Sequence, residues 1–157
     1  FPNGLSSEAS DVYKRQKYWY GIASFQKFDP KIHSNEKKKD DLCEDIFDIC
    51  VHRGSNLKLH ESISKGPYET NRDEQKQMDF EIYVSDTDKP PMYVTDQKCQ
   101  YLGKLTVELP KVKKGNKRAV FLNFIFGGTV LHVHATNNAN KEVTKATFDF
   151  LGNKRSD

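Results

Sequence analysis

Several features that assign a protein to a functional class are missing from this chain of 157 residues. It has no apolar run of about 18 residues and no basic-then-apolar leader, so the sequence predicts neither a membrane partner nor a signal peptide. The net charge is only +3, with Lys interspersed among Asp and Glu, so no nucleic-acid partner is indicated. No glycine-rich phosphate loop is present, because Gly127 and Gly128 stand between two strand-like segments, as in a hairpin.

Cysteine is also scarce. Cys43, Cys50 and Cys99 are an odd number with irregular spacing, which is not typical of a disulfide framework. Reduced thiols, and with them a cytoplasmic location, are therefore expected. A thiol nucleophile is the alternative, but the sequence places no base or oxyanion donor beside any cysteine. Small, buried, apolar side chains are the better interpretation, and we expect no catalytic residue and no enzymatic activity.

The chain does contain strong alternation of apolar and polar residues. Its 36% hydrophobic and 30% charged residues suffice for one domain with a core and a polar surface. Alternating runs separated by turn residues in residues 102–151 predict an antiparallel meander with one buried face. Strands are expected at residues 18–25, 57–63, 78–85, 101–109, 119–126, 129–136 and 142–151, with a short edge strand at 92–95 and polar loops at 26–41, 65–77 and 86–91. Residues 42–52 fit a helical face and a strand face equally well.

The first 16 residues differ in character from the rest. Residues 6–16 resemble translated sequencing-adaptor sequence, and an ordinary polar tail is the alternative; both predict disorder. The chain does not begin with Met, so we expect a natural protein that continues upstream. The expected plan is a non-native disordered tail at residues 1–16, one β-sandwich domain at 17–151 and a C-terminal tail at 152–157.

Two ordered motifs in the last third indicate a family. The run LGKLTVELP, followed by a strand and then by GGTVLHVHATNNANKEVTKATFDFL, resembles the β-sandwich substrate-binding domain of the 70-kilodalton heat-shock chaperones. The atypical subfamily 12 branch is the more similar, through Tyr20-Gly21-Ile22, through Cys43 with the DIFD that follows it, and through the FDFL ending. The resemblance covers residues 18–151 and implies a mainly β, antiparallel sandwich without the helical lid of standard chaperones.

The resemblance also implies a function. In the family this domain binds extended apolar peptides or client proteins, and it is coupled to an upstream ATP-binding, actin-like domain that this chain lacks. By position, Tyr68 and Thr70 fall on a loop of the peptide cleft, and Phe80 and Ile82 on the strand that lines it. ATP is thus implied only for the parent protein, and no cofactor for this chain. The alternative is a structural or protein-interaction sandwich with no open cleft, in which Phe80 and Ile82 belong to the core.

His132 and His134 form an H-x-H pattern on one expected strand. Such a pair can bind zinc when a third ligand is present, and Cys99 or His60 are the candidates. The apolar residues between and beside the histidines are expected to take the core face, so we interpret both rings as solvent-facing and expect no metal.

Residues 111–118 form a basic segment that could contact phosphate or acidic partners. It has no interleaved aromatic residues of the kind that bind single-stranded nucleic acid. We therefore interpret it as a solvated loop.

Overall fold

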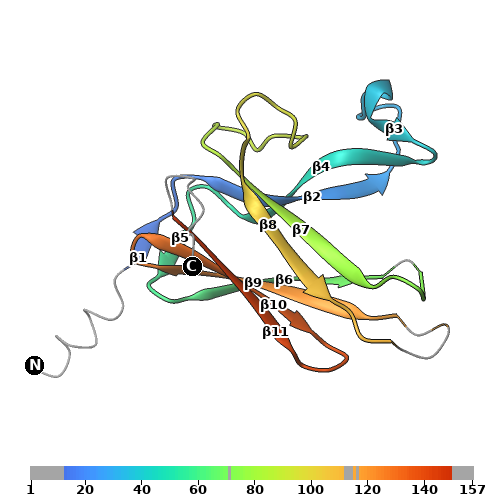
Figure 1. Ribbon diagram of the computed structural model, residues 1–157. Helices are drawn as coiled ribbons and strands as arrows, with labels where there is room; N and C mark the ends of the chain where they lie inside the picture. The colour runs from blue at the N-terminus through green and yellow to red at the C-terminus, as the bar shows by residue number, and fades with distance from the viewer. Residues whose placement is uncertain (1–12, 71, 112–114, 116, 150–157) are drawn as a thin grey trace, which may run out of the picture.

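The fold is a two-layer antiparallel β-sandwich, seen here in a computed structural model that describes residues 13–70, 72–111, 115 and 117–149. Two main sheets face each other, with strand orders β3-β4-β2-β7-β8 and β11-β10-β9-β6, and β1 pairs with β5 beside them (Figure 1). The strands are β1 (Tyr13–Arg15), β2 (Trp19–Lys27), β3 (Lys38–Lys39), β4 (Leu42–Val51), β5 (Asn56–Lys58), β6 (Ser62–Glu69), β7 (Gln77–Ser85), β8 (Gln100–Glu108), β9 (Ala119–Gly127), β10 (Val130–Asn137) and β11 (Val143–Asp149). The predicted fold class is confirmed.

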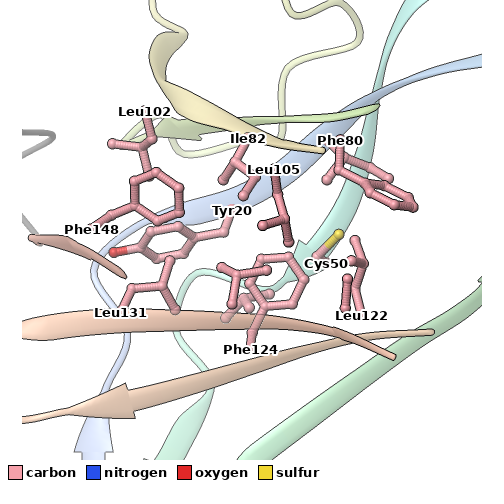
Figure 2. Packing of buried hydrophobic residues seen from close by; sticks show 14 of the residues in the cluster. Tyr20, Cys50, Phe80, Ile82, Leu102, Leu105, Leu122, Phe124, Leu131 and Phe148 are labelled. Carbon is pink, nitrogen blue, oxygen red and sulfur yellow. The ribbon is translucent and has the colours of Figure 1, made fainter. Parts of the chain in front are cut away.

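The alternating strands build the core. Along β9 and β10, buried and half-buried residues alternate without a break, so every second side chain points between the sheets. Phe124 and Leu131 from one sheet meet Tyr20 and Leu105 from the other, and all of them are buried (Figure 2). Each such side chain contributes about 1.5–3 kcal/mol of hydrophobic stabilisation, so this face-to-face contact holds the sandwich together.

No α-helix occurs within the described part of the chain, where a 3-10 turn, η1 (Asn35–Lys37), is the single helical element. The absence of a helical lid agrees with the prediction for these residues. No helix there is long and apolar enough to cross a membrane.

In the ambiguous segment, residues 42–51 form a strand, β4, which runs beside β2. Its pattern is ambiguous because β4 is buried on both sides. Cys50 belongs to the core between the sheets, whereas Ile46 and Phe47 are buried outside that cluster. Backbone bonds from Phe47 N to Met92 O, at 2.9 Å, and from Val94 N to Asp45 O, at 2.8 Å, tie residues 92–94 along the edge of β4.

Residues 92–95 therefore do not form the predicted edge strand. A single bridge between Ile46 and Tyr93 joins this segment to β4. The two prolines before it and the turns around it limit the pairing to that bridge, but the segment still covers backbone groups of an edge strand.

Two boundaries around β6 also differ from the prediction. The expected strand at residues 57–63 is interrupted at His60, whose φ of 65° turns the chain between β5 and β6. The expected loop at residues 65–77 begins as strand, because β6 continues to Glu69 through a register shift between Lys65 and Tyr68. Gly66 has a φ of 125° in this bulge, a value that glycine adopts without steric cost, and the edge position tolerates the following proline.

The last four residues of the expected N-terminal tail pair with another segment of the chain. Tyr13–Arg15 form β1 on β5, and Gln16 continues the pairing, with its N–H 2.8 Å from Ser55 O and its carbonyl 2.7 Å from Gly54 N. This partner strand is distant in sequence, so the polar composition of the segment did not reveal it. The remainder of the tail (residues 1–12) and residues 150–157 lie outside the described residues, and so do the last two residues of the strand expected at 142–151.

Candidate functional site

Phe80 and Ile82, two of the four residues expected to line a peptide cleft, lie on β7 inside the core. Their exposed fractions are 3% and 0%. Figure 2 shows both side chains pointing between the two sheets. Both side chains belong to the core cluster, and side chains of that cluster fill the space between the sheets.

Tyr68 lies on β6 rather than on a loop, and it closes the side of the sandwich where β6 faces β4. Its hydroxyl donates to Asp48 Oδ2 at 3.1 Å, and its ring packs edge-on against Phe80 at 5.4 Å between centroids. Burial, followed by the nearby Cys50 and Asp48, raises the pKa of Tyr68 above its ordinary value, so the hydroxyl remains a donor. Burial, with a smaller effect of Asp48, also raises the pKa of the Cys50 thiol to about 12, which removes its thiolate reactivity.

Thr70, the fourth expected residue, is buried just after β6 and pairs with Arg118. Thr70 N donates to Arg118 O at 3.1 Å, and Thr70 Oγ1 accepts from Arg118 N at 3.2 Å. These bonds fasten the loop that follows β6 to the start of β9. Thr70 therefore holds this loop in place, and its side chain is 4% exposed.

A groove opens beside Thr70, where the loop between β6 and β7 meets the loop between β8 and β9. We call it the loop groove; its volume is about 470 Å³. It is lined by Asp73, Glu74, Gln75, Lys76, Leu109, Lys111 and Arg118. Leu109 N donates to Lys76 O at 2.9 Å, so a backbone bond holds the two loops together beside the groove.

Arg118, which borders this groove, is buried, in contrast to the prediction from the sequence. It was included in a solvated basic loop, yet it is only 2% exposed. Its Nη1 donates to Pro110 O at 2.8 Å, and its Nη2 donates to Arg72 O at 3.2 Å and to Asp73 O at 3.0 Å. Nothing in the local sequence distinguishes Arg118 from its basic neighbours, because its acceptors come from two separate loops.

One N–H group of Arg118 and its charge have no matching partner among the described residues. No described carboxylate lies within ion-pair distance of its guanidinium, and Nε, which is buried, has no acceptor in the described chain. Among the described residues, the Arg118 guanidinium is therefore hydrogen-bonded by carbonyl oxygens.

A second groove, of about 330 Å³, lies on the outer face of the five-stranded sheet. Its lining includes Asp45, Asp79 and Glu81. Asp45 already pairs with Lys37 at 3.1 Å, and Asp79 accepts from Thr106 Oγ1 at 2.7 Å. Two of these three carboxylates therefore already have protein partners, which makes this groove the weaker candidate for a ligand site.

The H-x-H pair occupies the outward positions of β10, as predicted, and the core face holds its apolar neighbours. His132 Nδ1 lies 3.0 Å from Thr147 Oγ1. Burial, followed by the Lys145 and His132 charges, lowers the pKa of His134. Three His, Cys, Asp or Glu side chains do not gather into a metal-binding group anywhere in the described residues.

The cysteines are free, and two of them match the expectation of buried apolar side chains. Cys43 and Cys50 are buried, whereas Cys99 is half-buried, with its thiol 3.4 Å from Tyr93 O. Burial, followed by Asp96, raises the pKa of Cys99 to about 11.

The described residues thus define a two-layer antiparallel β-sandwich with a filled interior and a groove between two loops at one end. No protein-family model matches the chain, and a search of curated proteins found no match. The resemblance to the heat-shock chaperones therefore remains a prediction from the sequence.

Proposed function

We propose that this chain is a binding module for extended polypeptide segments, and that the segment lies in the loop groove rather than between the sheets. The observation that carries the proposal is the groove of about 470 Å³ beside Thr70, a volume within the usual range for ligand pockets. It lies near the loop where the resemblance expects peptide contacts, whereas Phe80 and Ile82 are enclosed in the core.

The few contacts that the groove can make with a peptide indicate weak binding. A few backbone hydrogen bonds contribute about 1 kcal/mol each, and one apolar side chain against Leu109 adds about 2–3 kcal/mol. That sum, before the cost of association, is below the roughly 8 kcal/mol of a micromolar complex. Peptides are therefore expected to bind this chain with dissociation constants above micromolar and to dissociate fast.

The wider proposal follows from the resemblance. The parent protein would be a cytoplasmic chaperone in which an upstream ATP-binding, actin-like domain controls this module, and its clients would expose extended apolar segments. The cytoplasmic part of this proposal rests on the odd number and irregular spacing of the three cysteines, which do not predict a disulfide framework.

The test is a titration of fluorescently labelled heptapeptides with an apolar centre against the whole chain and against Leu109→Gln. Leu109 is half-buried and borders the groove, so this variant removes apolar contact without placing a charge in the core. We expect saturable binding at high micromolar to millimolar peptide, and about tenfold weaker binding by the variant, equivalent to about 1.4 kcal/mol.

The matched control is Leu42→Gln at the start of β4, because Leu42 is 40% exposed and does not border the groove. This variant should bind the peptide with the same dissociation constant as the unchanged chain. Absence of binding at millimolar peptide contradicts the proposal, and binding unaffected by Leu109→Gln moves the site elsewhere. Substitution of Ile82 by Asp would not test peptide binding, because a carboxylate at this fully buried position destabilises the fold itself.

A second candidate is a protein-interaction sandwich with no peptide site. The bond from Tyr68 to Asp48 and the packing of Tyr68 on Phe80 favour it, because they close the region where a cleft was expected. The same titration separates the two candidates, since this second one predicts no saturable peptide binding.

A further inference from the structure

We propose that the outer face of the four-stranded sheet binds the same face of a second copy of this chain, about a twofold axis that crosses the strands. We call this surface the outer sheet face. Its side chains alternate with the buried ones: the even-numbered residues of 62–64 and 130–136, and the odd-numbered residues of 119–127 and 143–149. Within the described residues, no strand or helical turn packs on it (Figure 1). The inference is independent of the proposed function, because no residue that lines the loop groove lies on this face.

The first argument is the low charge of the outer sheet face. Ionised residues make up 30% of the chain, yet this face contains only Lys145 and Asp149, one of each sign. Phe121, Ile125 and Val130 are half-buried there and belong neither to the core cluster nor to the side chains packed against it. A surface without net charge does not repel its own copy and offers little to a strongly charged partner, which favours a second copy as the occupant.

The second argument is the position of the two charges. Lys145 and Asp149 stand two residues before and two residues after Thr147 on β11, so all three side chains point outward. A twofold axis that crosses the sheet at Thr147 places Lys145 of each copy over Asp149 of the other. The face is therefore complementary to itself, as the contact between two copies in a twofold dimer requires.

The residues at the axis are compatible with this arrangement. Cross-strand pairing forms one row through the four strands at this level, made of Thr147, His132, Ile125 and Ser62. Each member of the row contacts its own copy at a twofold axis, and none of them is charged while the imidazole is neutral. Ile125 thus meets Ile125 of the second copy in an apolar contact.

The third argument is the size of the face. Four strands about 4.8 Å apart, with about seven residues each at about 3.4 Å per residue, present roughly 450 Å² in projection. The smallest specific interfaces bury about 500 Å² per partner. Because protruding side chains make the accessible area larger than its projection, the face is large enough for a weak dimer. We expect a dissociation constant of about 10–100 μM.

Sedimentation equilibrium of the whole chain, from about 5 μM to about 1 mM at neutral pH, tests the inference. We expect a monomer–dimer equilibrium, and Ile125→Lys should weaken it about tenfold or more, because it brings two like charges together at the axis. Leu42→Lys is the matched control, since Leu42 is 40% exposed on the other sheet, and it should associate like the unchanged chain. A chain that remains monomeric at the highest concentration, or a dimer that Ile125→Lys does not weaken, would overturn the inference.

Exchange of the two charges tests the twofold arrangement without relying on Ile125→Lys. Lys145→Glu places two carboxylates over each other and should weaken the dimer about fivefold. Addition of Asp149→Lys to this variant should restore the association, because opposite charges then face each other again. Circular dichroism checks that both variants are folded. A double variant that associates as weakly as Lys145→Glu would overturn the twofold arrangement.

The histidines make the expected dimer sensitive to pH. His132 lies on the axis and His134 lies beside it, and the ring of His60 and that of His132 both lie within 3.6 Å of the position that a Cβ on Gly127 would take. The other charged groups that face these rings are Lys145 and Asp149 from β11, whereas β9 and β6 contribute Asn123, Ile125, Ser62 and Ser64, which do not titrate.

Protonation of these imidazoles places like charges on both sides of the axis. We therefore expect the dissociation constant of the dimer to rise about tenfold or more between pH 7.5 and pH 5.5. Sedimentation equilibrium at the two pH values measures this rise. Equal dissociation constants would contradict the placement of the histidines at the axis.

Discussion

Buried polar residues in this chain differ in how completely they are hydrogen-bonded. Thr70 exchanges two bonds with the backbone of Arg118. Asn137 Oδ1 accepts from Ala139 N at 2.9 Å, but Asn137 Nδ2, like Arg118 Nε, has no partner within the described residues. An unmet buried donor costs about 1–3 kcal/mol, so these two side chains are local weaknesses of the fold. Arg118 borders the loop groove, whereas Asn137 does not.

Cys50 gives a prediction at the residue scale. Its pKa is raised to about 12 from 9.0, so above pH 9 the unfolded chain loses a proton that the folded chain keeps. The unfolded state then binds fewer protons, and the free energy of unfolding falls with rising pH by about 1.4 kcal/mol per unit between these two values. Urea denaturation from pH 8 to 11 gives the free energy of unfolding of the unchanged chain and of Cys50→Ala. The variant lacks the contribution of the Cys50 thiol, whereas the tyrosines contribute to both pH curves. Parallel curves would contradict the prediction.

The element that most shapes the molecule is β4. It pairs with β2, reaches β6 through the Tyr68–Asp48 bond, and is covered along its edge by residues 92–94. Phe47 lies so close over β2 that a Cβ added to Gly21 would be 2.6 Å from Phe47 Cε1. A glycine is therefore required on β2 where the side chain from β4 crosses it.

The contact between β6 and β4 gives a prediction at the scale of elements. Tyr68→Phe removes the hydroxyl that donates to Asp48 and keeps the ring on Phe80, so we expect a loss of about 1 kcal/mol in the free energy of unfolding. Denaturant titration measures it. Tyr101→Phe is the control, since Tyr101 is 49% exposed on β8, and it should leave the stability unchanged. Equal stability of both variants would show that the bond does not hold the two strands together.

At the scale of the whole molecule, the two sheets form one unit. Contacts of β8 with β10 and β11 join them on one side, the Tyr68–Asp48 bond joins them on the other, and a single buried cluster fills the space between (Figures 1 and 2). Neither sheet can shield its inner face from water without the other, because each inner face consists of apolar side chains.

Unfolding should therefore be one cooperative transition. Trp19, the single tryptophan of the chain, lies on the five-stranded sheet and donates to Thr87 O at 2.7 Å, so its fluorescence reports that sheet. Far-UV circular dichroism reports both sheets. The two denaturation curves should coincide. Separate midpoints would show that the sheets unfold independently.

The parts of the fold that were predicted correctly have a local cause. The strands β7 to β10 follow a period-two pattern that neighbouring residues alone reveal. β4 was ambiguous because both of its sides are covered, and β6 was partly assigned to a loop because its Gly66 and the following proline are typical of turns.

The candidate site was less predictable. The apolar face of β7 was evident, but a pocket and a core have the same apolar pattern, and only the opposite sheet distinguishes them. Arg118 has the sequence context of a solvated loop. The carbonyl groups that surround it belong to the loop before β7 and to the loop after β8.

The sequence by itself determined that the chain forms antiparallel strands around one core, because alternation and turn residues act over a few neighbouring positions. Only the tertiary structure decided that Phe80 and Ile82 are enclosed, that Tyr68 joins two strands, and that Arg118 is buried beside a groove. These properties depend on which distant segments come into contact, and burial and hydrogen bonding are set by those contacts rather than by the residues next in the chain.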